Sequence, residues 1–106
     1  MAQIIWKDDA SHLLEAHIDY AMAEFGHKAV KNWYSSIRSI ESRLAQYPES
    51  YTIETLLLGK KHQYRSAIFM HNFKLIYYYE LSEDTVYIDI IWDMRMNPAS
   101  LQRKIR

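Results

Sequence analysis

Apolar residues recur at steps of three and four along residues 30–47, which is the spacing of one face of an α-helix. The series is Val30, Trp33, Ile37, Ile40, Leu44 and Tyr47. The intervening residues are mostly Ser, Asn, Arg and Gln, so this helix is predicted to have one buried stripe and one solvated face. Pro48 follows directly and ends the helix, because proline lacks the N–H group that helical hydrogen bonding needs. We interpret the stripe as core rather than as a cofactor or partner groove.

A second helix is predicted just before the first. Asp8 and Asp9 provide carboxylates that can cap a helix N-terminus. Apolar residues then follow at helical spacing, namely Leu14, Ile18, Ala21, Met22 and Phe25. Gly26 ends this helix, since glycine tolerates left-handed geometry. Only Gly26 and His27 separate the two helices, so they are predicted to form an antiparallel hairpin.

After Pro48 the apolar period changes from helical spacing to two, which is typical of strands. Three strands are predicted at about 64–70, 73–81 and 85–92, and short links between them indicate an antiparallel meander. A short strand is predicted at 2–6, and residues 53–58 form an extended lead-in. The predicted fold is therefore α+β. It has an N-terminal strand, an antiparallel helical hairpin packed on one face of a small antiparallel sheet, and a short C-terminal tail.

The register of the predicted sheet assigns its side chains to two faces. We expect a two-residue turn at His71-Asn72 that pairs Met70 with Phe73, and a second hairpin that pairs Leu81 with Val86. This register places most large apolar residues under the helices: Ile68, Met70, Phe73, Leu75, Tyr77, Tyr79, Leu81, Val86, Ile88, Ile90 and Trp92.

The opposite face is expected to be uncovered and to mix basic, tyrosine and carboxylate side chains. It carries Arg65, Ala67, Phe69, Lys74, Ile76, Tyr78, Glu80, Tyr87, Asp89, Ile91 and Asp93, with Arg95 if the last strand continues. One interpretation is a solvent face with cross-strand ion pairs, since Lys74 opposes Asp93 in this register. The other is a shallow site for a phosphate backbone or a surface for a partner strand.

Composition excludes several classes of chemistry. The 106 residues suit one domain, 1–106, and the net charge is zero. Without cysteine there is no disulfide, no Cys-based zinc site and no thiol catalysis. The five histidines show no metal-ligand spacing with carboxylates, so neither a metal nor another cofactor is expected. No membrane segment or signal peptide is recognisable, so we expect a cytoplasmic protein with no membrane partner.

Two stretches of the chain contain no acidic residue. Residues 55–79 hold Lys60, Lys61, His62, Arg65, His71 and Lys74, and residues 95–106 hold four basic residues. If these stretches converge they form a local anion-binding surface; otherwise they form a solvated face and a frayed tail.

The order and spacing of these elements resemble the RelE/ParE superfamily of bacterial toxins. The similar segments cover nearly the whole chain: Ile5-Trp6-Lys7-Asp8-Asp9-Ala10, Leu44-Ala45-Gln46-Tyr47-Pro48-Glu49, Tyr64-Arg65, Phe73-Lys74-Leu75-Ile76-Tyr77 and Ile90-Ile91-Trp92-Asp93-Met94-Arg95. The resemblance implies a growth-inhibiting toxin of a type II toxin–antitoxin system of the plasmid-stabilisation type. It also implies a cognate antitoxin that covers either Arg65, Lys74 and Arg95 or the outer face of the helices.

The resemblance implies two alternative targets, and a third hypothesis lies outside toxicity. ParE-like inhibition of DNA gyrase is preferred, and it requires an exposed apolar or aromatic patch but no acid–base set. The alternative is a RelE-like, metal-independent endoribonuclease that cleaves mRNA on the ribosome, in which Arg65, Lys74 and Arg95 would be catalytic. Zero net charge and the carboxylates Asp89 and Asp93 favour the gyrase branch. The third hypothesis is a non-toxic RNA- or protein-binding sheet, whose binding surface would include Phe69, Tyr78 and Tyr87.

Overall fold

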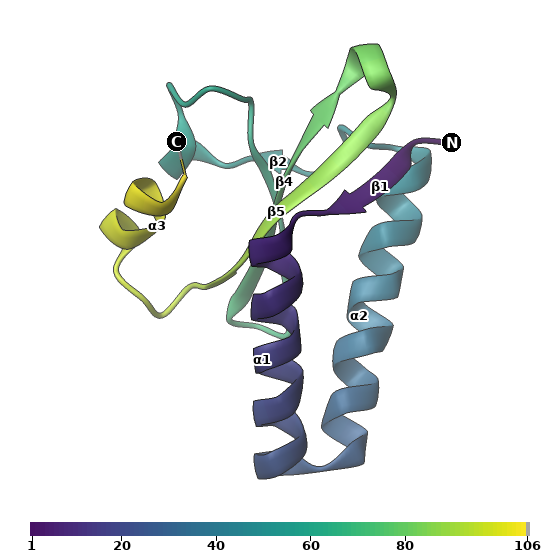
Figure 1. Cartoon of the computed structure of the whole chain (residues 1–106), viewed down its shortest axis with the longest axis vertical. Coiled ribbons are helices and arrows are strands. Elements are labelled where there is room, and N and C mark those ends of the chain that lie inside the picture. Colours follow the sequence, from purple (N-terminus) through teal and green to yellow (C-terminus); the bar gives the residue numbers. More distant parts are fainter. Residues whose placement is uncertain (106) are drawn as a thin grey trace.

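The computed structural model describes residues 1–105 and contains three α-helices and five strands in that range. In chain order they are β1 (Gln3–Trp6), α1 (Asp8–Phe25), α2 (His27–Gln46), β2 (Thr52–Ile53), β3 (Arg65–Phe69), β4 (Phe73–Glu80), β5 (Thr85–Asp93) and α3 (Pro98–Lys104). Figure 1 shows α1 and α2 as a hairpin whose connecting end extends beyond the sheet. Within the described residues, no helix is both long enough and apolar enough to cross a lipid bilayer.

The predicted helical hairpin is confirmed, and Gly26 is the residue that makes its turn. Its φ of +82° lies in the region that favours glycine, and its N–H donates to the Ala21 and Met22 carbonyl oxygens at 3.1 Å. The prediction that Asp8 and Asp9 cap the N-terminus of α1 is wrong. Lys7 occupies the N-cap position without a side-chain hydrogen bond, and the two carboxylates lie in the first helical turn, where they interact favourably with the helix dipole.

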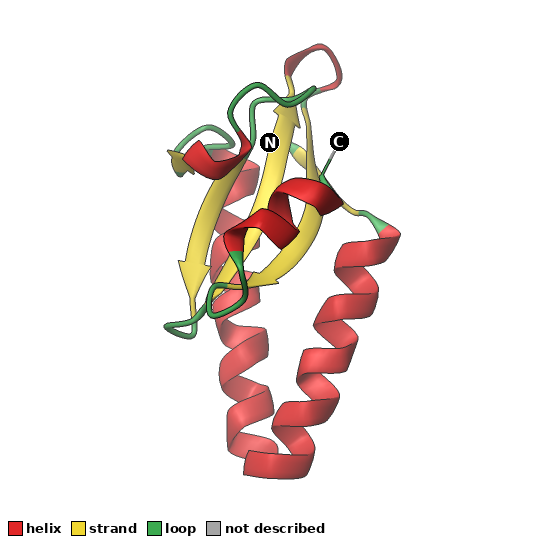
Figure 2. Cartoon of the chain, turned by 90° about the vertical axis from the view of Figure 1, so that its left-hand side faces the viewer, coloured by secondary structure: helices red, strands yellow, loops and turns green. Residues whose placement is uncertain are grey.

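The sheet has the strand order β1-β5-β4-β3-β2, and the predicted α+β fold class is confirmed. Strands β2 to β5 pair antiparallel, whereas β1 forms an edge of the sheet and pairs parallel with β5. Figure 2 shows that α3 lies in front of the sheet as seen from the side opposite the long helices. The expected C-terminal tail is therefore a short helix.

The register of the first predicted hairpin is wrong by one residue. Strand β3 pairs Phe69, not Met70, with Phe73. Met70 and His71 have left-handed φ values of +49° and +66°, and the Asn72 N–H donates to the Met70 carbonyl oxygen at 2.8 Å, so the connection takes three residues. A shift of one residue moves every side chain of β3 to the other face. Ala67 and Phe69 are therefore buried under the helices, and Ile68 is exposed.

The second predicted hairpin is wrong for a different reason. Val86 pairs with Tyr79 rather than Leu81, because Leu81 begins a 3-10 turn, Leu81–Glu83. Strand β5 also contains a β-bulge at Asp89, where the Tyr77–Ile88 pair is followed directly by the Ile76–Ile90 pair. The extra residue reverses the alternation beyond it, so Ile90 and Trp92 lie on the face away from the long helices.

Both faces of the sheet are covered, contrary to the prediction of an open face. The first core lies between the sheet and the long helices and includes Trp33, Leu44, Phe69, Leu75, Tyr77 and Ile88. The second core lies on the other face, under α3 and the segment 54–64 that precedes β3. It consists of Leu57, Tyr64, Ile76, Tyr78, Ile90, Trp92, Leu101 and Ile105.

Candidate functional site

Arg65, the first of the predicted catalytic residues, lies on the helix side of the sheet. It pairs with Tyr77, whose ring is fully buried in the first core. Its guanidinium donates to the Tyr51 carbonyl oxygen at 2.8 Å and to Gln63 Oε1 at 3.4 Å. These bonds fix Arg65 against the segment that leads into β2.

Lys74 lies on the opposite face and is paired with Trp92 across the sheet. Its Nζ donates to Glu54 Oε1 at 2.5 Å, and Glu54 Oε2 accepts from the Leu56 N–H at 3.1 Å. The Glu54 side chain is only 3% exposed. Burial alone raises the pKa of Glu54, but the hydrogen bonds from Lys74 and the Leu56 N–H outweigh it and hold this pKa below its ordinary value. Lys74 is thus neutralised by a buried carboxylate.

Arg95 lies just beyond the end of β5 and forms a two-point ion pair with Asp93. Its Nε and Nη2 donate to the two Asp93 carboxylate oxygens at 3.0 and 2.9 Å. These hydrogen bonds lower the pKa of Asp93 despite the opposing effect of burial. The guanidinium carbon also lies 5.8 Å from the centre of the Phe73 ring, on the helix side of the sheet.

The structure therefore does not assemble the three predicted catalytic residues on one face. Arg65 and Lys74 are separated by the sheet, and each of the three cations already has an acceptor within the protein. The expectation of a shared basic face is wrong for two reasons. The register of β3 moves Arg65 to the helix side, and the bulge at Asp89 in β5 moves Asp93 and Arg95 there, whereas Lys74 stays on the opposite face. Their catalytic role stays a prediction.

The predicted binding-surface aromatics are mostly buried. Phe69 belongs to the first core, where its ring lies edge-on to Trp33 at 5.3 Å between ring centres. Tyr78 lies in the second core. Its ring is parallel to the His62 ring, with 3.8 Å between the ring centres, and is stacked on the Tyr87 ring, with 5.2 Å between the ring centres. Only Tyr87 is half-buried, and its hydroxyl donates to Glu83 Oε1 at 2.6 Å.

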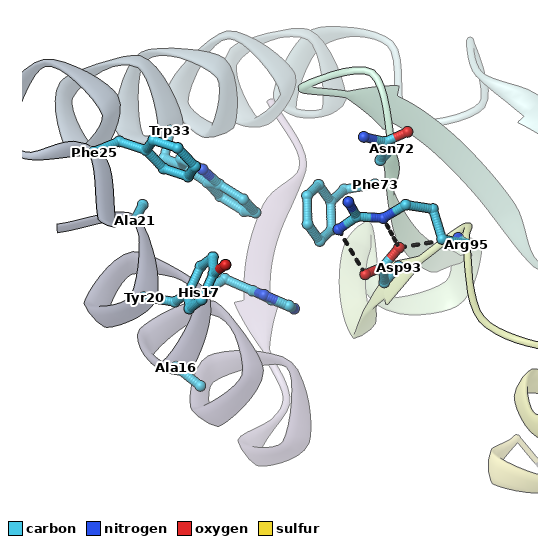
Figure 3. A pocket seen from close by; sticks show the side chains of 10 residues that line it. All are labelled: Ala16, His17, Tyr20, Ala21, Phe25, Trp33, Asn72, Phe73, Asp93 and Arg95. Carbon is cyan, nitrogen blue, oxygen red and sulfur yellow. Dashed lines mark hydrogen bonds and ion pairs between the residues drawn. The ribbon is translucent and has the colours of Figure 1, made fainter. Parts of the chain in front are cut away.

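A cavity of about 560 Å³ lies between the long helices and the ends of β4 and β5. Its lining residues are Ala16, His17, Tyr20, Ala21, Phe25, Trp33, Asn72, Phe73, Asp93 and Arg95. In Figure 3 the rings from α1 and α2 form one wall, and the Asp93–Arg95 ion pair stands opposite them. The cavity is thus mainly aromatic with one charged side, which is the usual character of a binding pocket.

Two aromatic side chains at this cavity are open to solvent. Tyr20 is 61% exposed and Phe25 is 70% exposed, and their rings meet edge to face at 6.4 Å. Met22 and Phe25 belong to the apolar residues that follow at helical spacing along the first helix, but the hairpin extends past the sheet and leaves them uncovered (Figure 1). A sequence pattern detects that these residues are apolar, but it does not give the length of helix that the sheet covers.

His17 is a titratable group in the aromatic wall of the cavity. Its ring is stacked on Trp33 at 5.5 Å and lies edge-on to Phe73 at 4.8 Å. Burial lowers the pKa of His17, and the Arg95 cation adds to this effect while Asp93 opposes it. The imidazole is therefore held in its neutral form near neutral pH. This role was not recognisable from the sequence, because the aromatic partners of His17 come from other elements.

Within residues 1–105, no three His, Cys, Asp or Glu side chains are grouped in a way that could hold a metal ion.

Known structures share this fold. No protein-family model and no curated protein matches the sequence. A chain of the chromosomal ParDE TA system from P. aeruginosa superimposes with a TM-score of 0.69 at 19% identity, covering 88% of this chain and 96% of that one. A metal-bound toxin from Helicobacter pylori superimposes with a TM-score of 0.65 at 14% identity, covering 90% of this chain and 97% of that one. The resemblance inferred from sequence motifs is thus confirmed at the level of the fold.

Proposed function

We propose that this chain is the toxin of a type II toxin–antitoxin module and that it arrests growth by binding a protein target, DNA gyrase. The observation that carries the proposal is the solvent-exposed pair Tyr20 and Phe25 at the rim of an aromatic cavity. An inhibitor that acts by protein contact needs such a patch. The fold shared with a chain of a ParDE TA system supports the same conclusion.

The chemistry of this surface suits a protein partner. Tyr, Trp, Phe and Arg are the residues enriched at the centres of protein interfaces, and all four types line the cavity. Tyr20 and Phe25 present large apolar area on a rigid helix, and Arg95 retains unused N–H donors toward solvent. A partner side chain that enters the cavity would contact Trp33 and Phe73 on its walls.

The arrangement of the cations argues against the ribonuclease alternative. Stabilising a cleaved phosphodiester requires positive groups that converge on one phosphate. Arg65 and Lys74 are on opposite faces of the sheet, and Lys74 is neutralised by the buried Glu54. The same proposal has three further parts. The chain forms a single domain, it acts in the cytoplasm, and a cognate antitoxin neutralises it.

The test is induced expression in a bacterial host, with growth, mRNA integrity and DNA double-strand breaks measured together. We expect growth arrest with DNA breaks and intact transcripts. The double variant Tyr20→Ala/Phe25→Ala is expected to relieve the arrest. The matched control is Tyr47→Ala, because Tyr47 is equally exposed but lies at the far end of α2, and this variant should stay toxic.

Three results would overturn the proposal. Cut transcripts with intact DNA would indicate the ribonuclease. Full toxicity of Tyr20→Ala/Phe25→Ala at equal soluble expression would show that the target binds elsewhere. Absence of growth arrest, with soluble wild-type protein confirmed by its circular dichroism spectrum, would show that this chain is not a toxin.

A further inference from the structure

The two acid-free stretches of the sequence meet in the folded chain. Lys60 Nζ donates to the Gln102 carbonyl oxygen at 2.7 Å, and Gln102 Nε2 donates to the Leu56 carbonyl oxygen at 3.1 Å. These bonds join α3 to the segment between β2 and β3, and both views show the two side by side. Leu101 and Leu57 are buried in the same core beneath the bonds.

The surface above this junction is positively charged. Lys61, Arg103 and Lys104 are exposed, and Lys60 is half-buried beside them. Residues 55–79 and 95–106 contain no Asp or Glu, and the neighbouring Glu54 is buried and bonded to Lys74. We call Lys60, Lys61, Arg103 and Lys104 the basic surface.

Two of these cations are oriented by bonds that leave donors free. The Lys60 ammonium bonds one carbonyl near the C-terminus of α3, where a positive charge is favourable. Arg103 Nη2 donates to Ser100 Oγ at 3.1 Å, which uses one of the five N–H groups of the guanidinium. The remaining donors can bind an anion.

A stack of aromatic rings adjoins the basic surface. His62 follows Lys61 directly, and its ring lies parallel to Tyr78, which stacks in turn on Tyr87. Burial lowers the pKa of His62, and the nearby cations Lys61 and Lys7 lower it further, while Glu80 and Asp89 act in the opposite direction. Asp89 is itself paired with Lys7 at 3.9 Å.

We infer that the basic surface binds the phosphodiester backbone of a nucleic acid, with the half-buried His62 ring beside it as a platform for a base. The buried Tyr78 ring supports His62 from its other face. Clustered Lys and Arg side chains next to stacked aromatic rings are the combination that binds nucleic acids without sequence preference. An acidic polypeptide would use the same cations but would gain nothing from the ring stack. This surface is separate from the cavity of the proposed function, so either can fail alone.

The test is fluorescence anisotropy of the purified full chain with three probes: a 20-base-pair duplex DNA, a 20-nucleotide single-stranded RNA, and a poly-glutamate whose charge matches that of the RNA. We expect at least one nucleic acid to bind at 50 mM salt and to lose affinity by about 100-fold at 200 mM, as four phosphate contacts imply. Comparison of the DNA and RNA arms identifies the source of the backbone.

Charge-reversal variants locate the binding. The triple variant Lys61→Glu/Arg103→Glu/Lys104→Glu should lower the affinity at least tenfold. The control Lys28→Glu/Lys31→Glu/Arg38→Glu reverses three exposed cations on α2 and changes the net charge equally, and it should lower the affinity less than threefold. Circular dichroism confirms that both variants are folded.

The inference is overturned if neither nucleic acid binds at 50 mM salt, if poly-glutamate binds as tightly as they do, or if both triple variants lose affinity equally. None of these results depends on growth arrest in cells, so they are distinguishable from failure of the proposed function.

Discussion

Arg65 and Lys74 lie on opposite faces of the same sheet, although only eight residues separate them in the sequence. Arg65 is paired with Tyr77 in the core under the long helices, whereas Lys74 is paired with Ile68 and Trp92 on the other face. A single phosphate therefore cannot contact both side chains without passing through the sheet. Three further features of the molecule can be tested by the stability of variants, and one by the titration of His17.

The register of β3 predicts opposite outcomes for two neighbouring residues. Phe69→Ala should lower the free energy of unfolding by about 3–5 kcal/mol, because it empties part of the first core against Trp33. Ile68→Ala should lower it by about 0.5 kcal/mol or less, since this side chain is 61% exposed. Urea unfolding followed by circular dichroism measures both. A larger loss for Ile68→Ala would contradict the register described here.

The Lys74–Glu54 ion pair predicts a non-additive pair of variants. Lys74→Met should destabilise the fold by about 3–5 kcal/mol, because it leaves the Glu54 carboxylate buried without its partner. In the double variant Lys74→Met/Glu54→Gln the buried charge is gone and the amide oxygen can still accept from Leu56, so most of this loss should be recovered. The control is Lys61→Met, which removes an exposed lysine. Equal stability of the single and double variants would show that Glu54 does not need Lys74.

His17 makes the stability depend on pH. Its folded-state pKa is lowered by burial, so on acidification the unfolded chain takes up a proton at about pH 6.5 before the folded chain does. The contribution of His17 to the free energy of unfolding should therefore be fully present above pH 6.5. It should fall as the pH drops below 6.5, until the imidazole of the folded chain is also protonated.

The variant His17→Phe should flatten this pH dependence, because phenylalanine can keep the contacts with Trp33 and Phe73 but carries no proton. Urea unfolding at a series of pH values gives the difference in slope. Proton NMR gives the titration midpoint of the His17 ring directly, and a midpoint at or above 6.5 would refute the argument.

The second core predicts that α3 contributes to stability. Leu101 is fully buried between α3 and the outer face of the sheet. Leu101→Ala should cost about 2–5 kcal/mol, as truncation of a buried leucine does. The control is Lys104→Ala on the same helix, which shortens an exposed side chain and should cost far less. A similar small effect for both variants would mean that α3 is not packed on the sheet in solution.

Secondary structure was largely predictable because each pattern here is local. The stripe from Val30 to Leu44, Gly26 with a positive φ, and Pro48 after the second helix determine the hairpin within a few residues of one another. The position of Arg65 was not predictable, because the sequence of residues 70–72 is compatible with a two-residue or a three-residue turn. The choice between these turns reverses the face of every residue in β3.

The sequence by itself determined the α+β class, the helical hairpin, the antiparallel strands and the two acid-free stretches. Only the tertiary structure decided which face each cation occupies, that α3 covers the second face, and that Tyr20 and Phe25 stay exposed beside a cavity. The physical reason is that helix spacing and turn formation depend on neighbours along the chain, whereas strand register and face coverage depend on packing between residues that are distant in sequence. Phe69 is held under the helices by Trp33, and Leu101 is buried against the face that carries Ile76.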